Sequence, residues 1–215
     1  MDTHSIFSFY AMAALLGIGH TLLGPDHYVP LIALSRARGW TCRRTFAVTL
    51  ACGPAHVLSS VLIGAAGLAF GFKVLQLEKL EAVRGGIAGW TLLAAGLLYF
   101  LWGLRQAFRS QGPEKDMGRK ADGIIGWLLF LFFVFGPCEP LIPVLLFPAA
   151  AHGPWAAVVP VLIFSLSTLA AMSACVAAGL YGMSWIKIPQ PVRYGHALAG
   201  AALTVCGIAV SFAGF

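Results

Sequence analysis

Long apolar stretches separated by short polar segments run through the whole chain. A helix needs about 20 apolar residues to cross the hydrocarbon core of a bilayer. Six stretches are long enough, at about residues 6–34, 45–72, 86–104, 123–150, 155–181 and 195–214. The pattern therefore predicts an all-α integral membrane protein with six transmembrane helices.

The composition agrees with a membrane protein and argues against other classes. Of the 215 residues, 59% are hydrophobic and 10% are charged, whereas soluble domains contain about 25% charged residues. Mean hydropathy is +0.84. The net charge of +6 does not indicate a nucleic-acid partner, because the basic residues lie in the short polar segments. The five cysteines are scattered and form no CxxC pair, which argues against a disulfide framework.

Lysine and arginine are distributed unequally between the two sides that six spans would create. One side contains only three, Lys73, Lys79 and Arg84. The other side contains eleven: Arg36, Arg38, Arg43, Arg44, Arg105, Arg109, Lys115, Arg119, Lys120, Lys187 and Arg193. Cytoplasmic loops are enriched in these residues. We therefore expect an inner-membrane protein with both termini on the periplasmic side.

The two halves of the chain repeat each other. Gly24-Pro25 recurs at an offset of 112, and three glycines of the third stretch recur in the sixth at an offset of 111: Gly89, Gly96 and Gly103 match Gly200, Gly207 and Gly214. The sequence predicts a first repeat at 1–107, a cytoplasmic loop at 108–122 and a second repeat at 123–215. Because each repeat has three spans, the halves lie in opposite orientations, as in many secondary transporters.

Gly-Pro pairs interrupt the first, second and fourth stretches, and we expect each pair to break its helix. Lipid cannot satisfy the polar backbone groups that a break frees, so each break has to face protein or a wet cavity. Each pair is followed by side chains that can bind metal: Gly24-Pro25 by Asp26 and His27, Gly53-Pro54 by His56, and Gly136-Pro137 by Cys138 and Glu139.

These side chains, with His20 seven residues before His27, suggest a metal site. Asp26 and Glu139 are the only acidic residues within the six stretches, and an acidic side chain there indicates a functional site. Imidazole and carboxylate suit Ni, Co, Zn and Fe, whereas a thiolate favours Zn or Cu(I). The predicted ligands are His20, Asp26, His27, His56, Glu139 and Cys138. Two alternatives remain: the carboxylates form a proton relay, or the histidines only tie helices together.

Short motifs around these residues resemble a known group of membrane proteins. The segment from Gly19 to His27 is similar to the first-helix signature of the nickel/cobalt transporter (NicO) family and its UreH-like and TauE/SafE-like relatives, although five residues separate His20 from Asp26 where the family has four. Pro54-Ala-His56-Val-Leu-Ser-Ser resembles the second motif, and Gly-Pro-Cys138 resembles the UreH/DsbD segment of the wider LysE–DsbD superfamily. The resemblance implies a transporter of Ni²⁺, Co²⁺ or a similar cation, with His20, Asp26, His27 and His56 as ligands.

We therefore expect a transporter of a divalent transition-metal ion rather than an enzyme, working by alternating access. Its partners would be the ion and the lipid bilayer, and a homo-oligomer is left open. Three other functions compete: a DsbD-like thiol and electron carrier, a membrane-embedded metalloenzyme, and an exporter of a small anion. The first needs a close cysteine pair, and the last needs fixed positive charge or helix N-termini.

Overall fold

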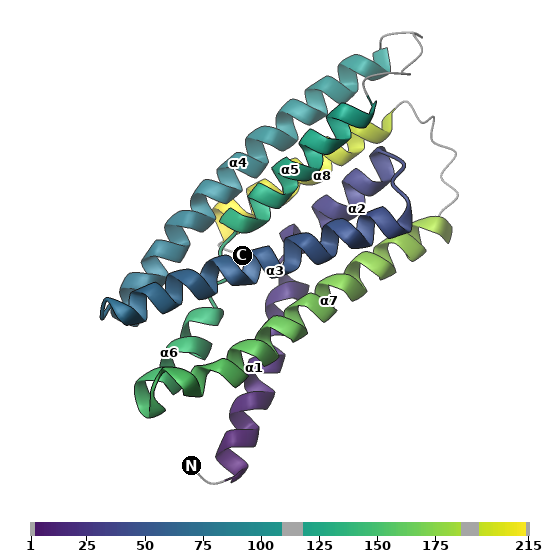
Figure 1. Ribbon diagram of the computed structural model, residues 1–215. Helices are drawn as coiled ribbons and strands as arrows, with labels where there is room; N and C mark the ends of the chain where they lie inside the picture. Colours follow the sequence, from purple (N-terminus) through teal and green to yellow (C-terminus); the bar gives the residue numbers. More distant parts are fainter. Residues whose placement is uncertain (1–2, 109–117, 186–193, 214–215) are drawn as a thin grey trace.

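The computed structural model describes residues 3–108, 118–185 and 194–213, and within these ranges the chain is helical and contains no strand. Figure 1 shows the elements in chain order: α1 (Thr3–Leu23), η1 (Pro25–His27), α2 (Val29–Ala37), α3 (Cys42–Ala69), α4 (Val74–Phe108), α5 (Gly118–Phe135), α6 (Leu141–His152), η2 (Pro154–Ala157), α7 (Val158–Trp185) and α8 (Gly195–Ala213). The predicted all-α class is confirmed.

Among the described residues, four segments are long and apolar enough to cross a membrane: Cys42–Ala69, Val74–Phe108, Pro154–Gly182 and Gly195–Phe212. Large apolar side chains also cover the outside of the helices; Leu15, Leu98 and Val205 are 69%, 69% and 65% exposed. Water does not favour so much exposed apolar surface, whereas lipid does. These features suit a membrane protein.

Two of the three predicted helix breaks are present. The first helix ends at Leu23 and resumes after η1 as α2, and the fourth ends at Phe135 and resumes at Leu141. The predicted break at Pro54 is wrong, because α3 continues through it. Pro54 lies on the exposed face of α3, while Cys52 and His56 beside it are buried. Packing of that buried face holds the helix together where one hydrogen bond is missing.

The third helix begins earlier than its hydropathy predicts. We expected its start near residue 86, but α4 begins at Val74. Glu81 and Arg84 therefore lie within a helix, and Glu81 is fully buried. Asp26 and Glu139 are therefore not the only acidic residues within the apolar helices, and that inference is corrected.

Glycines bring α4 and α8 into close antiparallel contact. A Cβ atom at Gly96 would lie 2.5 Å from the backbone nitrogen of Thr204, and one at Gly207 would lie 2.4 Å from that of Leu93. Neither helix has room for a side chain at these positions. The α4–α8 pair is therefore the most tightly apposed part of the fold.

Alanine at Gly96 is expected to destabilise the protein by about 1–3 kcal/mol, because the added methyl group would overpack this contact. Alanine at Gly182 of α7, where an added Cβ meets nothing within 4 Å, should instead stabilise the helix by up to about 1 kcal/mol. Thermal unfolding of both variants in detergent measures the difference. Equal shifts in the same direction would contradict the close α4–α8 contact.

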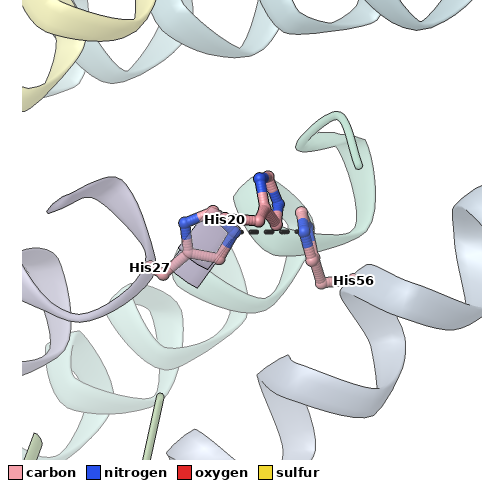
Figure 2. A group of neighbouring side chains, drawn as sticks. All are labelled: His20, His27 and His56. Atoms are coloured by element: carbon pink, nitrogen blue, oxygen red, sulfur yellow. Dashed lines mark hydrogen bonds between the residues drawn. The ribbon is translucent and has the colours of Figure 1, made fainter. Parts of the chain in front are cut away.

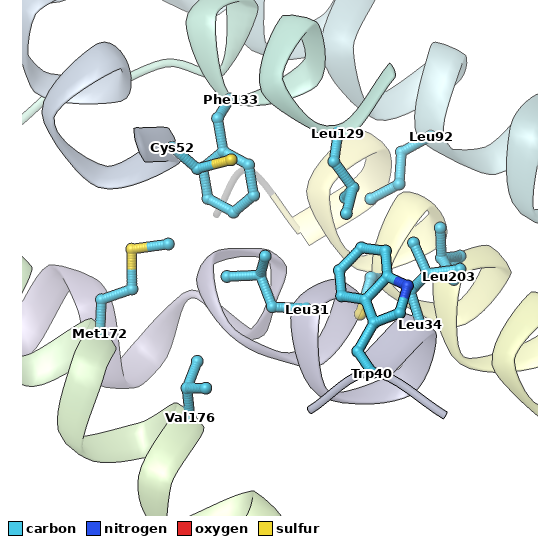
Figure 3. Packing of buried hydrophobic residues seen from close by; sticks show 11 residues of the cluster. Leu31, Leu34, Trp40, Cys52, Leu92, Leu129, Phe133, Met172, Val176 and Leu203 are labelled. Atoms are coloured by element: carbon cyan, nitrogen blue, oxygen red, sulfur yellow. The ribbon is translucent and has the colours of Figure 1, made fainter. Parts of the chain in front are cut away.

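The buried core joins both halves of the chain. Leu31 of α2, Cys52 of α3, Phe133 of α5 and Met172 of α7 converge in one apolar cluster (Figure 3). A second cluster contains Ala13, Val57, Cys138, Leu141, Val144 and Phe164. The broken helices lie beside these two clusters, which positions the groups described next.

Candidate metal centre

Three histidines from α1, η1 and α3 converge on one point. His20 lies in the last turn of α1, His27 ends η1, and His56 lies in the middle of α3. One ring nitrogen from each lies within 4.8 Å of the others, and Figure 2 shows the three rings turned toward one another. His27 and His56 are almost completely buried, with 1% and 2% exposure.

The hydrogen bonds of His27 and His56 determine which nitrogens face each other. Nδ1 of His27 lies 3.0 Å from the carbonyl oxygen of Gly24, and Nδ1 of His56 lies 3.2 Å from that of Phe133. A carbonyl oxygen only accepts hydrogen bonds, so both Nδ1 atoms carry the proton. In neutral rings each Nε2 then presents a lone pair.

The two Nε2 atoms lie 3.3 Å apart, the contact drawn as a dashed line in Figure 2. Two lone pairs at this distance repel each other unless a cation lies between them. Two nitrogen ligands bound at about 2.0–2.1 Å to a tetrahedral Zn²⁺ would lie about 3.3 Å apart. The spacing therefore suits two ligands of one transition-metal ion. A proton shared between the two Nε2 atoms would also remove the repulsion.

His20 supplies a third nitrogen. Its Nε2 is buried and has no hydrogen-bond partner. The ring lies parallel to that of His56 at 6.0 Å between centroids, and edge-on to that of His27 at 4.5 Å. A buried polar atom without a partner is costly, and its presence in a native fold needs an explanation. Metal coordination would provide one.

Proline explains why a backbone carbonyl is free to bind His56. In an α-helix the N–H of residue 137 would bond to the carbonyl of Phe133. Pro137 has no N–H, so the Phe133 carbonyl accepts from His56 Nδ1 instead. The break between α5 and α6 also comes close to the ring, because a Cβ at Gly136 would lie 3.1 Å from His56 Nδ1.

Asp26 lies behind His27 rather than beside its free nitrogen. The Asp26 Oδ1 atom is 3.2 Å from Nδ1 of His27, and the carboxylate is 5% exposed. A carboxylate in this position orients an imidazole and increases its basicity toward a metal bound at the other nitrogen. The structure thus places Asp26 as a partner of a candidate ligand.

Gly24 is needed for this arrangement, because a Cβ there would lie 2.7 Å from His27 Nδ1 and 2.8 Å from Asp26 Oδ1. Gly24→Ala is therefore expected to displace both groups and weaken metal binding by about tenfold or more. Gly19→Ala in the preceding helix α1 is the matched control, since its Cβ meets nothing within 4 Å. Calorimetric titration with Ni²⁺ and Zn²⁺ compares the variants; equal affinities would contradict this role of Gly24.

The structure separates Cys138 and Glu139 from the three histidines. Cys138 is fully buried in the second apolar cluster. Glu139 is exposed and lines a cavity of about 470 Å³ whose wall also includes His20. Neither belongs to the group of nitrogens within 4.8 Å. Glu139 and His20 therefore face the same cavity.

Glu81 and Arg84 were missed by the sequence analysis because α4 was expected to begin after them. They form a buried ion pair beside the α5–α6 break. A signal was available: Glu81 lies four residues after Leu77 and four before Gly85, and all three are buried on one face of α4. The spacing of small and apolar residues could have extended the helix to include them.

Within the described residues the chain is all-helical and suited to a membrane, with two buried histidines and one half-buried histidine beside the helix breaks. Comparison of the chain with models of known families, with curated proteins and with solved structures found no match. The functional argument therefore depends on the geometry of this group.

Proposed function

We propose that the protein transports a divalent transition-metal ion, such as Ni²⁺, Co²⁺, Zn²⁺ or Fe²⁺, across a membrane, as the resemblance to the NicO family implies. The observation that carries the proposal is the pair of Nε2 atoms of His27 and His56, 3.3 Å apart with both Nδ1 protons donated elsewhere. His20 would complete a three-nitrogen site. Borderline divalent ions are the cations that prefer imidazole.

The surroundings favour a transported ion over a catalytic one. The cavity beside His20 gives the ion an approach, and Glu139 supplies a carboxylate on its wall. The alternative thiol carrier needs two cysteines close together. All five cysteines lie within the described residues, and each is a free thiol; Cys138 is enclosed by apolar side chains. Metal transport therefore accounts for more of the site.

We also propose six spans in two inverted repeats, with the interrupted helices α1–α2 and α5–α6 each counted once. The glycine contacts support it, because Gly96 meets Thr204 and Gly207 meets Leu93. Gly207 lies 111 positions after Gly96, and Thr204 lies 111 positions after Leu93, so the two contacts are equivalent under the repeat. Likewise α1 packs on α7, and its counterpart α5 packs on α3. Inverted repeats of this kind work by alternating access.

The distribution of charge supports an inner-membrane protein with both termini on the periplasmic side. The α2–α3 turn and the C-terminal ends of α4 and α7 lie at one end of the bundle, and the α3–α4 turn lies at the other (Figure 1). The first end carries most of the basic residues, as expected for the cytoplasmic side. The cavity is lined by early residues of α4 and late residues of α8, so we place its opening toward the periplasm.

Transport is tested with purified protein in liposomes that enclose a metal-sensitive dye. Wild-type protein should move Ni²⁺, Co²⁺ or Zn²⁺ faster than empty liposomes, and the double variant His27→Gln/His56→Gln should lose this flux. His152→Gln at the exposed end of α6 is the control histidine and should keep it. Flux equal to that of empty liposomes for all three ions and Fe²⁺, or full flux in the double variant, would refute the proposal.

A further inference from the structure

A buried ion pair on α4 lies next to the break between α5 and α6. The side chains of Glu81 and Arg84 are 0% and 13% exposed, and they bond to each other. Charges in this setting are expensive and usually have a function. Neither residue belongs to the histidine group, so the pair needs its own explanation.

The pair bonds to the polar backbone groups that the break leaves without helical partners. Arg84 Nη2 donates to the carbonyl oxygens of Val134 at 2.9 Å and Gly136 at 3.2 Å. Glu81 Oε2 accepts from the backbone N–H of Cys138 at 3.1 Å. One cation and one anion thus replace the hydrogen bonds of an interrupted turn, as lipid-embedded backbone requires.

Each of these bonds follows from the sequence of the break. Pro140 has no N–H, so the Gly136 carbonyl lacks its helical donor. The Cys138 N–H would normally bond to the Val134 carbonyl, but it points to Glu81 instead. Two serines of α3 extend the network, since Arg84 also donates to Ser59 at 2.9 Å and Ser60 at 3.3 Å. The network therefore joins α3, α4 and the break.

The same break determines the position of His56. Phe133, whose carbonyl accepts from His56 Nδ1 at 3.2 Å, directly precedes Val134, which Arg84 holds. Gly136, held by the same guanidinium, also lies beside this ring, because a Cβ there would be 3.1 Å from His56 Nδ1. A change in the conformation of the break would therefore move the group that orients His56.

The break in the first helix is held differently. There the Gly24 carbonyl accepts from the backbone N–H of His27 at 3.1 Å and from Nδ1 of the same residue. Tyr28 Oη donates to the Leu22 carbonyl at 3.4 Å. Residues of the first break thus satisfy its own backbone, whereas the second break depends on charged side chains from another helix.

We propose that Glu81 and Arg84 are positioning residues of the ion site: they hold the α5–α6 break in the conformation that orients His56. The inference rests on the proposed function, because it assigns them a role in binding the transported ion. Neither residue contacts the ion. They act through Val134, Gly136 and Cys138 on the carbonyl that bonds to His56.

Two conservative variants test this role. Glu81→Gln keeps the size of the side chain, but its NH₂ group faces either Arg84 or the Cys138 N–H, so one donor loses its acceptor. Arg84→Lys keeps the charge but lacks the planar fork of donors that reaches Ser59, Val134 and Gly136 together. Glu78→Gln, three residues earlier on α4, is the control because it removes the same charge outside the network.

Metal affinity is measured by calorimetric titration of the detergent-solubilised proteins with Ni²⁺ and Zn²⁺. Glu81→Gln and Arg84→Lys should bind roughly tenfold to a hundredfold more weakly than wild type, as expected when a residue that orients a ligand is lost. Glu78→Gln should bind as wild type does. Unchanged affinity in both test variants would overturn the proposal.

Alkylation with N-ethylmaleimide, followed by mass spectrometry, gives a readout that does not depend on metal. Cys138 is 0% exposed and should react in the two test variants, while Cys52 and Cys206 of the first cluster stay protected. Reaction of all three would indicate general unfolding and overturn the positioning role. If wild type binds no metal, the proposed function fails, and Cys138 labelling alone decides whether the pair holds the break.

Discussion

Glutamine at His27 is expected to reduce metal affinity by at least about a hundredfold. The substitution removes one of two facing Nε2 lone pairs and the Nδ1–H bond to Gly24. The partner nitrogen of His56 is then left without a second ligand at 3.3 Å. Glutamine at His56 should have a similar effect for the same reason, and the two losses should not add, because both remove one shared site.

Calorimetry with Ni²⁺ and Zn²⁺ measures both affinities, with His152→Gln as the control. Binding by wild type should also weaken as the pH falls, because protons compete for the nitrogens that bind metal and are released on binding. Retention of wild-type affinity in the double variant, or additive losses from the single variants, would show that the two rings do not share an ion.

Leucine at Glu81 is expected to destabilise the protein by about 3–5 kcal/mol, the usual cost of leaving one partner of a buried ion pair alone. Arg84 would keep its charge beside α3 without the carboxylate, and the Cys138 N–H would lose its acceptor. Thermal unfolding in detergent should therefore show a large fall in midpoint.

Leucine at Glu78, one turn earlier on α4 and only partly buried, is the comparison and should change stability by less than about 1 kcal/mol. The double variant Glu81→Leu/Arg84→Leu adds a second test. Removing both charges should recover part of the loss, because no unpaired charge remains. A Glu81→Leu protein as stable as the Glu78→Leu protein would mean that the ion pair does not support the fold.

The sequence predicts the helical class and the convergence of the histidines, because long apolar stretches and Gly-Pro pairs act locally. His20 and His27 flank one break, and their approach to each other follows from their spacing. The prediction of a helix break at Pro54 is wrong for a different reason. The proline ring lies on the exposed face of α3 while Cys52 and His56 pack inside, and packing against other helices is not visible in a local pattern.

The roles of the charged residues are also hidden from a linear pattern. Glu81 and Arg84 precede the predicted start of an apolar stretch and so resemble loop residues; only the structure shows their contacts with the α5–α6 break. Cys138 and Glu139 are adjacent in the chain, yet one is enclosed and the other lines a cavity. Which way each side chain points depends on the backbone at the break, which hydropathy does not determine.

The glycine contacts between α4 and α8 limit how the molecule can move. The contact has no room for a side chain at Gly96 or Gly207, so sliding one helix along the other would bring a larger residue into a space that fits only glycine. The pair lines one part of the cavity, and α1 lines another. In the transport cycle that we propose, α1 and its neighbours would therefore move against this two-helix frame.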